Sequence, residues 1–193
     1  MITDVNIVNT QVLSDNWYVL RKVTYAYLKN NGTRVTQTRE VYDRGNGAAI
    51  LLYNTIQKTV LLARQFRLPT FLNDNENGML VEVCAGLLDK DTPEECVKRE
   101  AMEELGYKIT NVKKVFEAYM SPGAVTELLH FFVAEYTSAM KVTEGGGLEA
   151  EEENIEVLEL AFDAVFNMIA TGEIRDAKTI MLLQYAKLNG LIN

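Results

Sequence analysis

The stretch Gly86–Tyr107, which reads GLLDKDTPEECVKREAMEELGY, decides the fold of this chain. It predicts a helix that begins near Asp91 or Thr92, with Pro93 well placed in the first turn. Gly106 is a natural stop, because glycine readily adopts the left-handed conformation that ends helices. The segment therefore supplies one well-bounded helix between the strands predicted on either side of it.

Three glutamates of this helix, Glu100, Glu103 and Glu104, stand at positions i, i+3 and i+4 and therefore share one face. Carboxylates this close repel one another unless a cation relieves them. Oxygen ligands suit Mg²⁺ or Mn²⁺, which then binds the phosphates of a substrate. A solvated acidic surface is the alternative for three glutamates taken alone. An apolar stripe beside them would pack on a sheet: Val97, Ala101 and Leu105.

Composition limits the class of protein. The 193 residues, 48% of them hydrophobic, suit one domain with a substantial core and an appended N-terminal segment. No apolar run approaches the ~20 residues of a membrane helix, and the start MITDVNIVNT lacks the features of a signal peptide, so we expect a cytoplasmic protein. The net charge of -8 argues against nucleic-acid binding through phosphate contacts, whereas a small phosphorylated ligand stays compatible with it.

Cysteine and histidine are too scarce for several kinds of site. Cys84 and Cys96 make no disulfide framework, and we expect both to be reduced core residues. The single histidine, His130, argues against a zinc site and against Cys–His or Ser–His catalysis, although a lone histidine base stays possible. Because it lies inside the apolar run Leu128–Ala134, we interpret His130 as a structural strand residue.

The order of elements predicts an α+β fold. Strands come first, then the glutamate helix, then strands again, and two helices close the chain. We divide the chain into an N-terminal antiparallel β segment, residues 1–43, and a main domain, residues 44–193. The predicted strands are Trp17–Leu20, Val23–Leu28, Thr33–Tyr42, Ala48–Tyr53, Thr59–Arg64, Met79–Cys84, Val112–Tyr119, Leu128–Tyr136 and Ile155–Leu160. The two predicted closing helices are Phe162–Thr171 and Ala177–Leu188.

The helix and its flanks resemble the signature of the Nudix hydrolases, G-x5-E-x7-R-E-U-x-E-E-x-G-U, where U is a bulky apolar residue. Arg99–Tyr107 matches the second half, with Ala101 and Tyr107 as loose fits at two apolar positions. The first half departs, since Asp91 replaces the glutamate of the family and Gly86 lies one residue closer to it than the signature requires. The resemblance implies the Nudix fold, a mixed β-sheet sandwiched between helices.

Further motifs are similar to the branch of this family that contains the ADP-sugar and GDP-mannose pyrophosphatases. They are Arg39–Gly47, Arg64–Arg67, Tyr119–Gly123, Glu127, Gly145–Gly147, Ile155–Val157, and Gly172–Asp176 with Lys178 and Thr179. The resemblance implies a homodimer, in which the N-terminal β segment crosses to the partner, and Mg²⁺-dependent hydrolysis of a nucleotide sugar, GDP-mannose giving GMP and mannose 1-phosphate. Two alternatives are ADP-ribose as substrate, giving AMP and ribose 5-phosphate, and a non-catalytic domain that senses a nucleotide sugar.

The expected metal ligands are Glu100 and Glu104, one turn apart, with Glu103 adjacent and able to share the ions directly or through water. The resemblance adds the backbone carbonyl of Ala85 as a ligand, at the end of the strand that faces the helix. Mn²⁺ is a possible substitute for Mg²⁺.

A second acidic stretch lies in the glycine-rich loop Glu144–Asn154, and such a run is most often simply solvated. The resemblance places Glu153 at a further metal-ligand position and Glu151 at the position of the general base. Glu152 is the alternative if the alignment is displaced by one residue. A mobile loop that carries the base would exclude bulk water on closing.

Two residues beside the glutamates have supporting parts to play. Arg99 belongs with Glu103 and Glu151 in the predicted catalytic set. It is either a clamp for phosphate or, as we favour, a partner that orients the neighbouring glutamates. Asp91 is interpreted as a helix cap or a charge that stabilises the helix start.

Six residues are candidate substrate contacts: Trp17, Arg39, Glu40, Arg67, Glu127 and Lys178. Arginine suits pyrophosphate oxygens, and a carboxylate accepts hydrogen bonds from sugar hydroxyls or a guanine edge. For Arg39 and Glu40, an ion-pair ladder between strands is an equal alternative. Trp17 either stacks on a base or is buried in the core or a dimer interface.

Overall fold

The computed structural model describes residues 1–192, and at Glu151 the backbone alone. The chain forms two compact units. The first comprises Met1–Asn46 and Tyr119–Leu128, and the second comprises Gly47–Ala118 and Leu129–Asn193.

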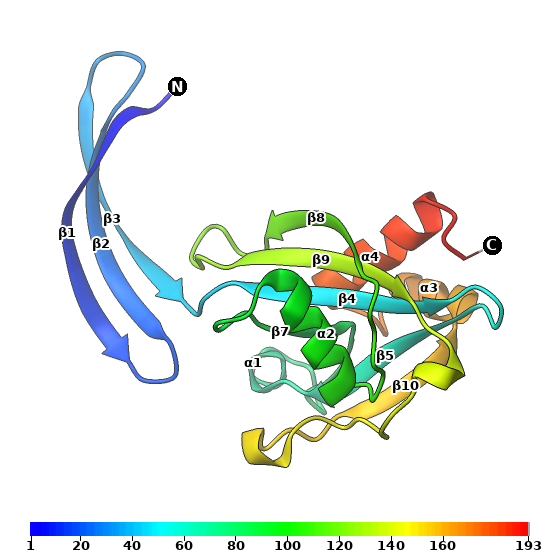
Figure 1. The fold of residues 1–193 in the computed structure, drawn as a ribbon. Helices are drawn as coiled ribbons and strands as arrows, with labels where there is room; N and C mark the ends of the chain where they lie inside the picture. The colour runs from blue at the N-terminus through cyan, green and yellow to red at the C-terminus, as the bar shows by residue number, and fades with distance from the viewer. Residues whose placement is uncertain (193) are drawn as a thin grey trace. The chain divides into compact units, whose positions relative to one another are not determined.

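A three-stranded antiparallel sheet in the order β1-β2-β3 makes the first unit (Figure 1), with β1 Thr3–Asp15, β2 Val19–Leu28 and β3 Arg34–Asp43. β2 and β3 form a hairpin, and Gly32 adopts a φ of 78° in its turn. The prediction that Trp17 begins a strand is wrong, because β2 starts at Val19 and Trp17 lies in the preceding turn.

Sequence patterning missed β1 altogether. Its pairing with β2 shifts register at three places along its length. Each irregularity breaks the period of two that reveals a half-buried strand. Almost every residue of β1 is exposed within the chain, so burial imposes no regular alternation either.

The segment Tyr119–Leu128 braces the end of β3 inside the first unit. The Tyr42 backbone N–H donates to the Ala124 carbonyl at 2.8 Å, and the Thr126 N–H donates back to the Tyr42 carbonyl at 3.0 Å. The Thr126 hydroxyl donates to the Asp43 carboxylate at 3.0 Å. A loop distant in sequence thereby completes the pocket that contains Arg39 and Glu40.

The second unit is built on a seven-stranded sheet with the main order β10-β5-β4-β9-β8, in which β6 pairs with β5 and β7 with β4. It is mixed, because β4 runs parallel to β9 and antiparallel to β5 and β7. Its strands are β4 Gly47–Asn54, β5 Thr59–Phe66, β6 Met79–Glu82, β7 Cys84–Leu87, β8 Lys113–Tyr119, β9 Leu128–Glu135 and β10 Glu156–Ala161. Its helices are α1 Leu68–Phe71, α2 Pro93–Glu103, α3 Phe162–Thr171 and α4 Ala177–Leu188, with 3-10 turns at Ser138–Met140 and Glu149–Glu151.

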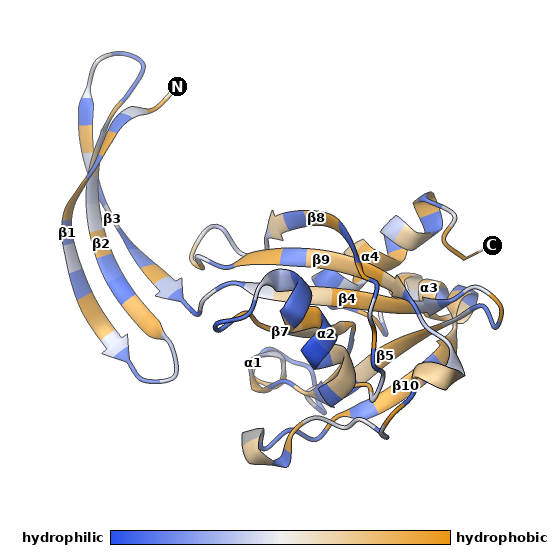
Figure 2. Cartoon of the chain, viewed as in Figure 1, coloured by the Kyte–Doolittle hydropathy of each residue, from blue (hydrophilic) through white to orange (hydrophobic). Residues whose placement is uncertain are grey.

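Helices cover both faces of this sheet, with α2 in front and α3 and α4 behind in Figure 1. The central strand β4 is accordingly apolar on both faces, as Figure 2 shows, and its Ala48–Leu52 stretch is fully buried. The predicted stripe Val97, Ala101 and Leu105 is also fully buried, in one core cluster with alternate residues of β4. The predicted α+β fold is confirmed.

Both ends of α2 follow local signals. Thr92 is the N-cap and forms a capping box with Glu95, so the prediction that Asp91 caps the helix is wrong. Gly106 takes a φ of 81° just after the helix, and the Tyr107 N–H donates to the Ala101 carbonyl at 3.0 Å. This is the Schellman pattern, and it confirms the predicted stop.

The predicted closing helices are confirmed at both ends, as α3 and α4. Cys84 and Cys96 are free and buried, as expected. Among the residues described, no helix combines the length and apolar character needed to cross a membrane.

Candidate functional site

The glutamate face of α2 is organised by Arg99. Its guanidinium donates to the carboxylates of Asp91 at 2.9 Å, Glu100 at 2.8 Å and Glu103 at 2.9 Å, and to the Leu87 carbonyl at 3.3 Å. These bonds hold three carboxylates together around one cation. Asp91 precedes the first residue of α2 and is therefore a partner of Arg99 from outside the helix. The geometry is that of an arginine that orients its neighbours rather than one free to clamp phosphate.

Glu104 is the most buried of these acids, with 3% of its surface exposed. Burial is the main cause that raises its pKa to about 8, and the charges of Glu100 and Glu153 add to it. Burial likewise raises the pKa of Glu100 to about 7. In the described part of the chain, Oε2 of Glu104 has no hydrogen-bond partner. A buried carboxylate oxygen without a hydrogen-bond partner is unfavourable, and a bound cation would compensate it.

The expectation that Ala85 stands at the end of a strand is wrong, because Ala85 lies inside β7, between Cys84 and Gly86. Ala85 and Gly86 are paired with Ala49 and Ala48 of β4, so their backbone is held by the sheet. A Cβ built on Gly86 would overlap the Glu100 carboxylate. Only glycine at this position lets that carboxylate lie directly over β7 at Gly86.

Two glycines bring the second acidic loop to the end of α2. The Gly146 N–H donates to the Glu104 carbonyl at 2.8 Å, and the Gly147 N–H donates to the Glu103 carbonyl at 3.1 Å. The Glu153 carboxylate packs on Gly147 and accepts from the Leu148 N–H at 3.0 Å.

The remaining acids of this loop differ in how they are placed. Glu153 is partly buried, and its charge adds to the raised pKa of both Glu100 and Glu104. Glu152 is exposed and has a left-handed backbone, with a φ of 56°. The side chain of Glu151, the predicted base, lies outside what the structure describes.

This donor set fits a hard divalent cation. It consists of the buried Glu104 carboxylate, the partly buried Glu100 carboxylate, the Ala85 carbonyl and the Glu153 carboxylate, all oxygen ligands of the kind that Mg²⁺ prefers. Within the described residues, no group of three or more His, Cys, Asp or Glu side chains is arranged to hold a metal ion by itself. Water and phosphate oxygens are therefore expected to complete the coordination.

The raised pKa values predict how stability depends on pH. The ordinary pKa of both glutamates is 4.5, so the folded protein keeps protons on Glu100 and Glu104 that the unfolded chain has already released. Their contribution to stability is therefore full below about pH 4.5 and is lost as pH rises through 7 to 8. Mg²⁺ binds the ionised carboxylates, so we expect it to raise the melting temperature more at pH 8.5 than at pH 6.

Thermal unfolding in EDTA and in Mg²⁺ at the two pH values measures this effect. The Glu104→Gln variant is the control, because it keeps the shape of the side chain and removes the group with the higher pKa. A Mg²⁺ effect that is larger at pH 6 would contradict the assignment of these two carboxylates.

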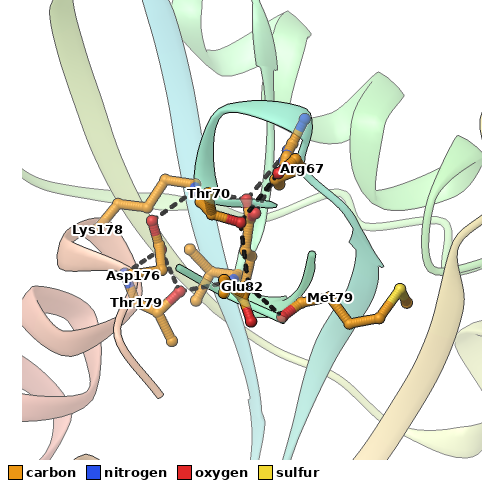
Figure 3. A network of polar contacts seen from close by, with 9 residues as sticks. Arg67, Thr70, Met79, Glu82, Asp176, Lys178 and Thr179 are labelled. Carbon is orange, nitrogen blue, oxygen red and sulfur yellow. Dashed lines mark hydrogen bonds and ion pairs between the residues drawn. The ribbon is translucent and has the colours of Figure 1, made fainter. Parts of the chain in front are cut away.

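A second polar cluster holds two of the predicted substrate contacts (Figure 3). The buried Glu82 carboxylate accepts from Arg67 Nε at 2.8 Å and Nη2 at 3.0 Å, and from Lys178 Nζ at 2.6 Å. Asp176 accepts from Lys178 at 2.8 Å and caps α4 through Thr179. Sequence reasoning missed Glu82, although a lone charge inside the apolar run Met79–Cys84 was a signal that it needed partners.

The other candidate substrate contacts lie in the first unit. Arg39 and Glu40 line a pocket of about 610 Å³ with residues of the loop 119–126. Arg39 donates to the Thr38 carbonyl at 2.9 Å and to Gln37 at 3.2 Å, so no carboxylate pairs with it in the described chain. The ion-pair ladder is therefore absent at Arg39 among the described residues.

Trp17 and Glu127 differ sharply in exposure. Trp17 is 83% exposed, which excludes the interpretation that it is buried in the core of this chain. A base-stacking role and a dimer interface both stay open for it. The Glu127 side chain is only 14% exposed and pairs with Arg44 at 3.6 Å. His130 lies on β9, as predicted for a strand residue, with its Nδ1 3.2 Å from the Glu117 carboxylate.

Comparisons with known proteins cover nearly the whole chain. Residues 4–42 match the family model described as the GDP-mannose pyrophosphatase NudK N-terminal domain, and residues 43–183 match the NUDIX domain. A GDP-mannose pyrophosphatase of Yersinia enterocolitica is 59% identical over 185 residues, 96% of each chain. One of Salmonella arizonae is 53% identical over 100% of both chains. A solved structure titled "Crystal structure of ADP compounds hydrolase" has a TM-score of 0.71 at 18% identity and covers 98% of this chain and 96% of that one.

Proposed function

This chain belongs to the Nudix hydrolase family, and from that membership we propose that it hydrolyses the pyrophosphate of GDP-mannose to give GMP and mannose 1-phosphate. The observation that supports hydrolysis most directly is the glutamate face of α2, where Oε2 of the buried Glu104 has no partner among the described residues. The choice of sugar nucleotide is supported by the match of residues 4–42 and by relatives at 52–59% identity that carry this name.

The proposed metal ligands are the Ala85 carbonyl and the carboxylates of Glu100, Glu104 and Glu153, and Mg²⁺ is the proposed ion, with Mn²⁺ as a substitute. A bound divalent ion would supply positive charge to the pyrophosphate oxygens and would acidify the attacking water. Arg99 keeps the carboxylates of Glu100 and Glu103 aligned before the substrate arrives. Little covalent chemistry is then asked of the protein, because positioning and charge neutralisation supply most of the rate.

The remaining roles fall to side chains that act on water and substrate. Glu151 takes the proton of the water that attacks phosphorus. Arg67 and Lys178 bind phosphate oxygens. The substrate contacts expected in the first unit, Arg39 and Glu40, stay predictions. A homodimer, the N-terminal segment 1–43 as its interface, the main domain 44–193 and a cytoplasmic location stay predictions.

A panel of nucleotide sugars tests the proposed function. The protein is incubated in Mg²⁺ with GDP-mannose, ADP-ribose, ADP-glucose and UDP-glucose, and the products are identified by mass. Preferred cleavage of GDP-mannose to GMP and mannose 1-phosphate supports the proposal. Preferred cleavage of ADP-ribose would replace the substrate, and binding without turnover would replace the enzyme by a sensor.

The general base is tested within its own loop. Glu151→Gln is expected to lower kcat about 10²-fold or more without weakening the binding of Mg²⁺, because it removes a proton acceptor and no metal ligand. Glu152→Gln is the neighbouring control and is expected to stay near wild type, since its side chain is exposed. A larger effect of Glu152→Gln would displace the assignment by one residue.

A further inference from the structure

Glu82 stands out as a buried charge with no part in the chemistry described above. It ends β6 with 1% of its surface exposed, two residues before Cys84. Both of its oxygens are occupied by cations from distant parts of the chain: Arg67 grips them in a fork, and Lys178 shares Oε2. An ionised carboxylate is tolerated at such depth only when cations compensate it this fully.

The cluster is electrically balanced. Glu82 and Asp176 face Arg67 and Lys178, two negative against two positive charges. Burial alone would raise the pKa of Glu82, but Lys178 and Arg67 hold it below its ordinary range. Glu82 is therefore ionised at neutral pH and keeps both cations in place.

The backbone beside Glu82 is anchored as well. The Val83 N–H donates to the Thr179 hydroxyl at 2.8 Å, and that hydroxyl donates to Asp176 at 2.5 Å. The start of α4 is thereby joined to the strand segment that leads to Ala85. Side chain and backbone of this short segment are both immobilised by the same helix (Figure 3).

Arg67 and Lys178 retain donors after these bonds are counted. The fork uses Nε and Nη2 of Arg67, and in the described chain Nη1 donates to no protein group. Arg67 is 40% exposed, whereas Glu82 is 2% exposed at its side chain. The cluster thus presents Arg67 outward, whereas the Lys178 side chain is only 16% exposed and Glu82 is hidden beneath both cations.

We propose that Glu82 is a positioning residue, which holds Arg67 and Lys178 as a rigid pair of cations that binds a phosphate group of the substrate. Glu82 itself never touches the substrate. This inference rests on the proposed function for the identity of the substrate, but the receptor it describes would take any compact phosphate anion. Pre-organised cations lose less freedom on binding than flexible ones, so the benefit appears in affinity.

Glu82→Gln tests the inference, because glutamine keeps the volume but cannot accept from both cations at once. Inorganic pyrophosphate is the probe, measured by calorimetry in EDTA so that no metal takes part. We expect its Kd to rise about 10-fold, the size of effect that a lost charge-assisted bond produces. KM for GDP-mannose should rise by a similar factor, with kcat within about 3-fold of wild type.

Glu159→Gln is the matched control on the same sheet. The Glu159 carboxylate accepts from the Tyr136 hydroxyl at 2.8 Å and belongs to no part of the site, so any loss of stability should leave pyrophosphate binding unchanged. If Glu82→Gln does not fold, Glu82→Asp is the second variant. It keeps the charge but withdraws the carboxylate from Arg67 by one methylene, and the same loss of affinity for pyrophosphate is expected.

The outcomes separate this inference from the proposed function. Loss of stability with unchanged affinity for pyrophosphate would reduce Glu82 to a structural role, and so would a wild-type protein that does not bind pyrophosphate. A wild type that cleaves no nucleotide sugar would overturn the proposed function alone. In that case a weaker affinity of the Glu82 variant for pyrophosphate would still support the proposal that Glu82 positions Arg67 and Lys178 to bind phosphate.

Discussion

Glu104→Gln is expected to lower the turnover of GDP-mannose by at least about 10³-fold, because it removes a charged ligand from the centre of the proposed metal site. The fold should remain, since glutamine has the same shape and its neutral amide suits a site that is 3% exposed. In EDTA at pH 8, the variant should be at least as stable as wild type, because burial already resists ionisation of this carboxyl and raises its pKa to about 8. Steady-state kinetics and thermal unfolding measure the two effects.

Glu94→Gln is the control for that experiment. Glu94 lies on the same helix, is exposed and pairs with Lys98 at 2.6 Å, so turnover should change little. Wild-type turnover of Glu104→Gln in Mg²⁺ would exclude Glu104 as a ligand. A loss of turnover accompanied by unfolding would assign Glu104 to stability instead.

Gly106→Ala is expected to lower the free energy of unfolding by about 3 kcal/mol, from two causes that add. The φ of 81° is strained for any residue with a Cβ, and a Cβ there would overlap the Thr143 carbonyl oxygen. The close contact between Gly106 and Thr143 positions the loop whose Gly146 N–H donates to the Glu104 carbonyl. Turnover should therefore fall as well. Denaturant unfolding and turnover are the measurements.

Gly32→Ala separates the two causes. Gly32 has nearly the same φ, 78°, but nothing lies within 4 Å of a Cβ built on it. The control should therefore cost only about 1 kcal/mol and leave turnover unchanged. Equal losses of the free energy of unfolding in the two variants would show that the space between Gly106 and the Thr143 carbonyl has room for a methyl group.

Much of the fold was predictable because its signals are local. The start and stop of α2 depend on residues within one turn of each end, and its buried stripe on a period of 3.6. The buried strands β4 and β5 were also predictable, because each shows in the sequence as a continuous apolar run. β1 escaped prediction because its irregular pairing removed the alternation that marks a strand.

The candidate site was predictable only in part. The glutamates of α2 share a face by spacing alone, and Arg99 lies within reach of them on the same helix. The hydrogen bond that makes Thr92 rather than Asp91 the cap is a detail of side-chain geometry, which residue types leave open. For Arg39, the pairing found is with its own strand, and spacing offered no reason to choose it over a ladder.

By itself, the sequence determined the helix that carries the carboxylates, the apolar strands beneath it and the acidic character of the second loop. Tertiary structure decided that Oε2 of Glu104 is buried without a partner among the described residues, and that Glu82 binds Arg67 and Lys178, 15 and 96 residues away. The physical reason is the distance along the chain over which each interaction acts. Capping and periodicity act within a turn, whereas compensation of a buried charge depends on whatever the folded chain brings within hydrogen-bond distance.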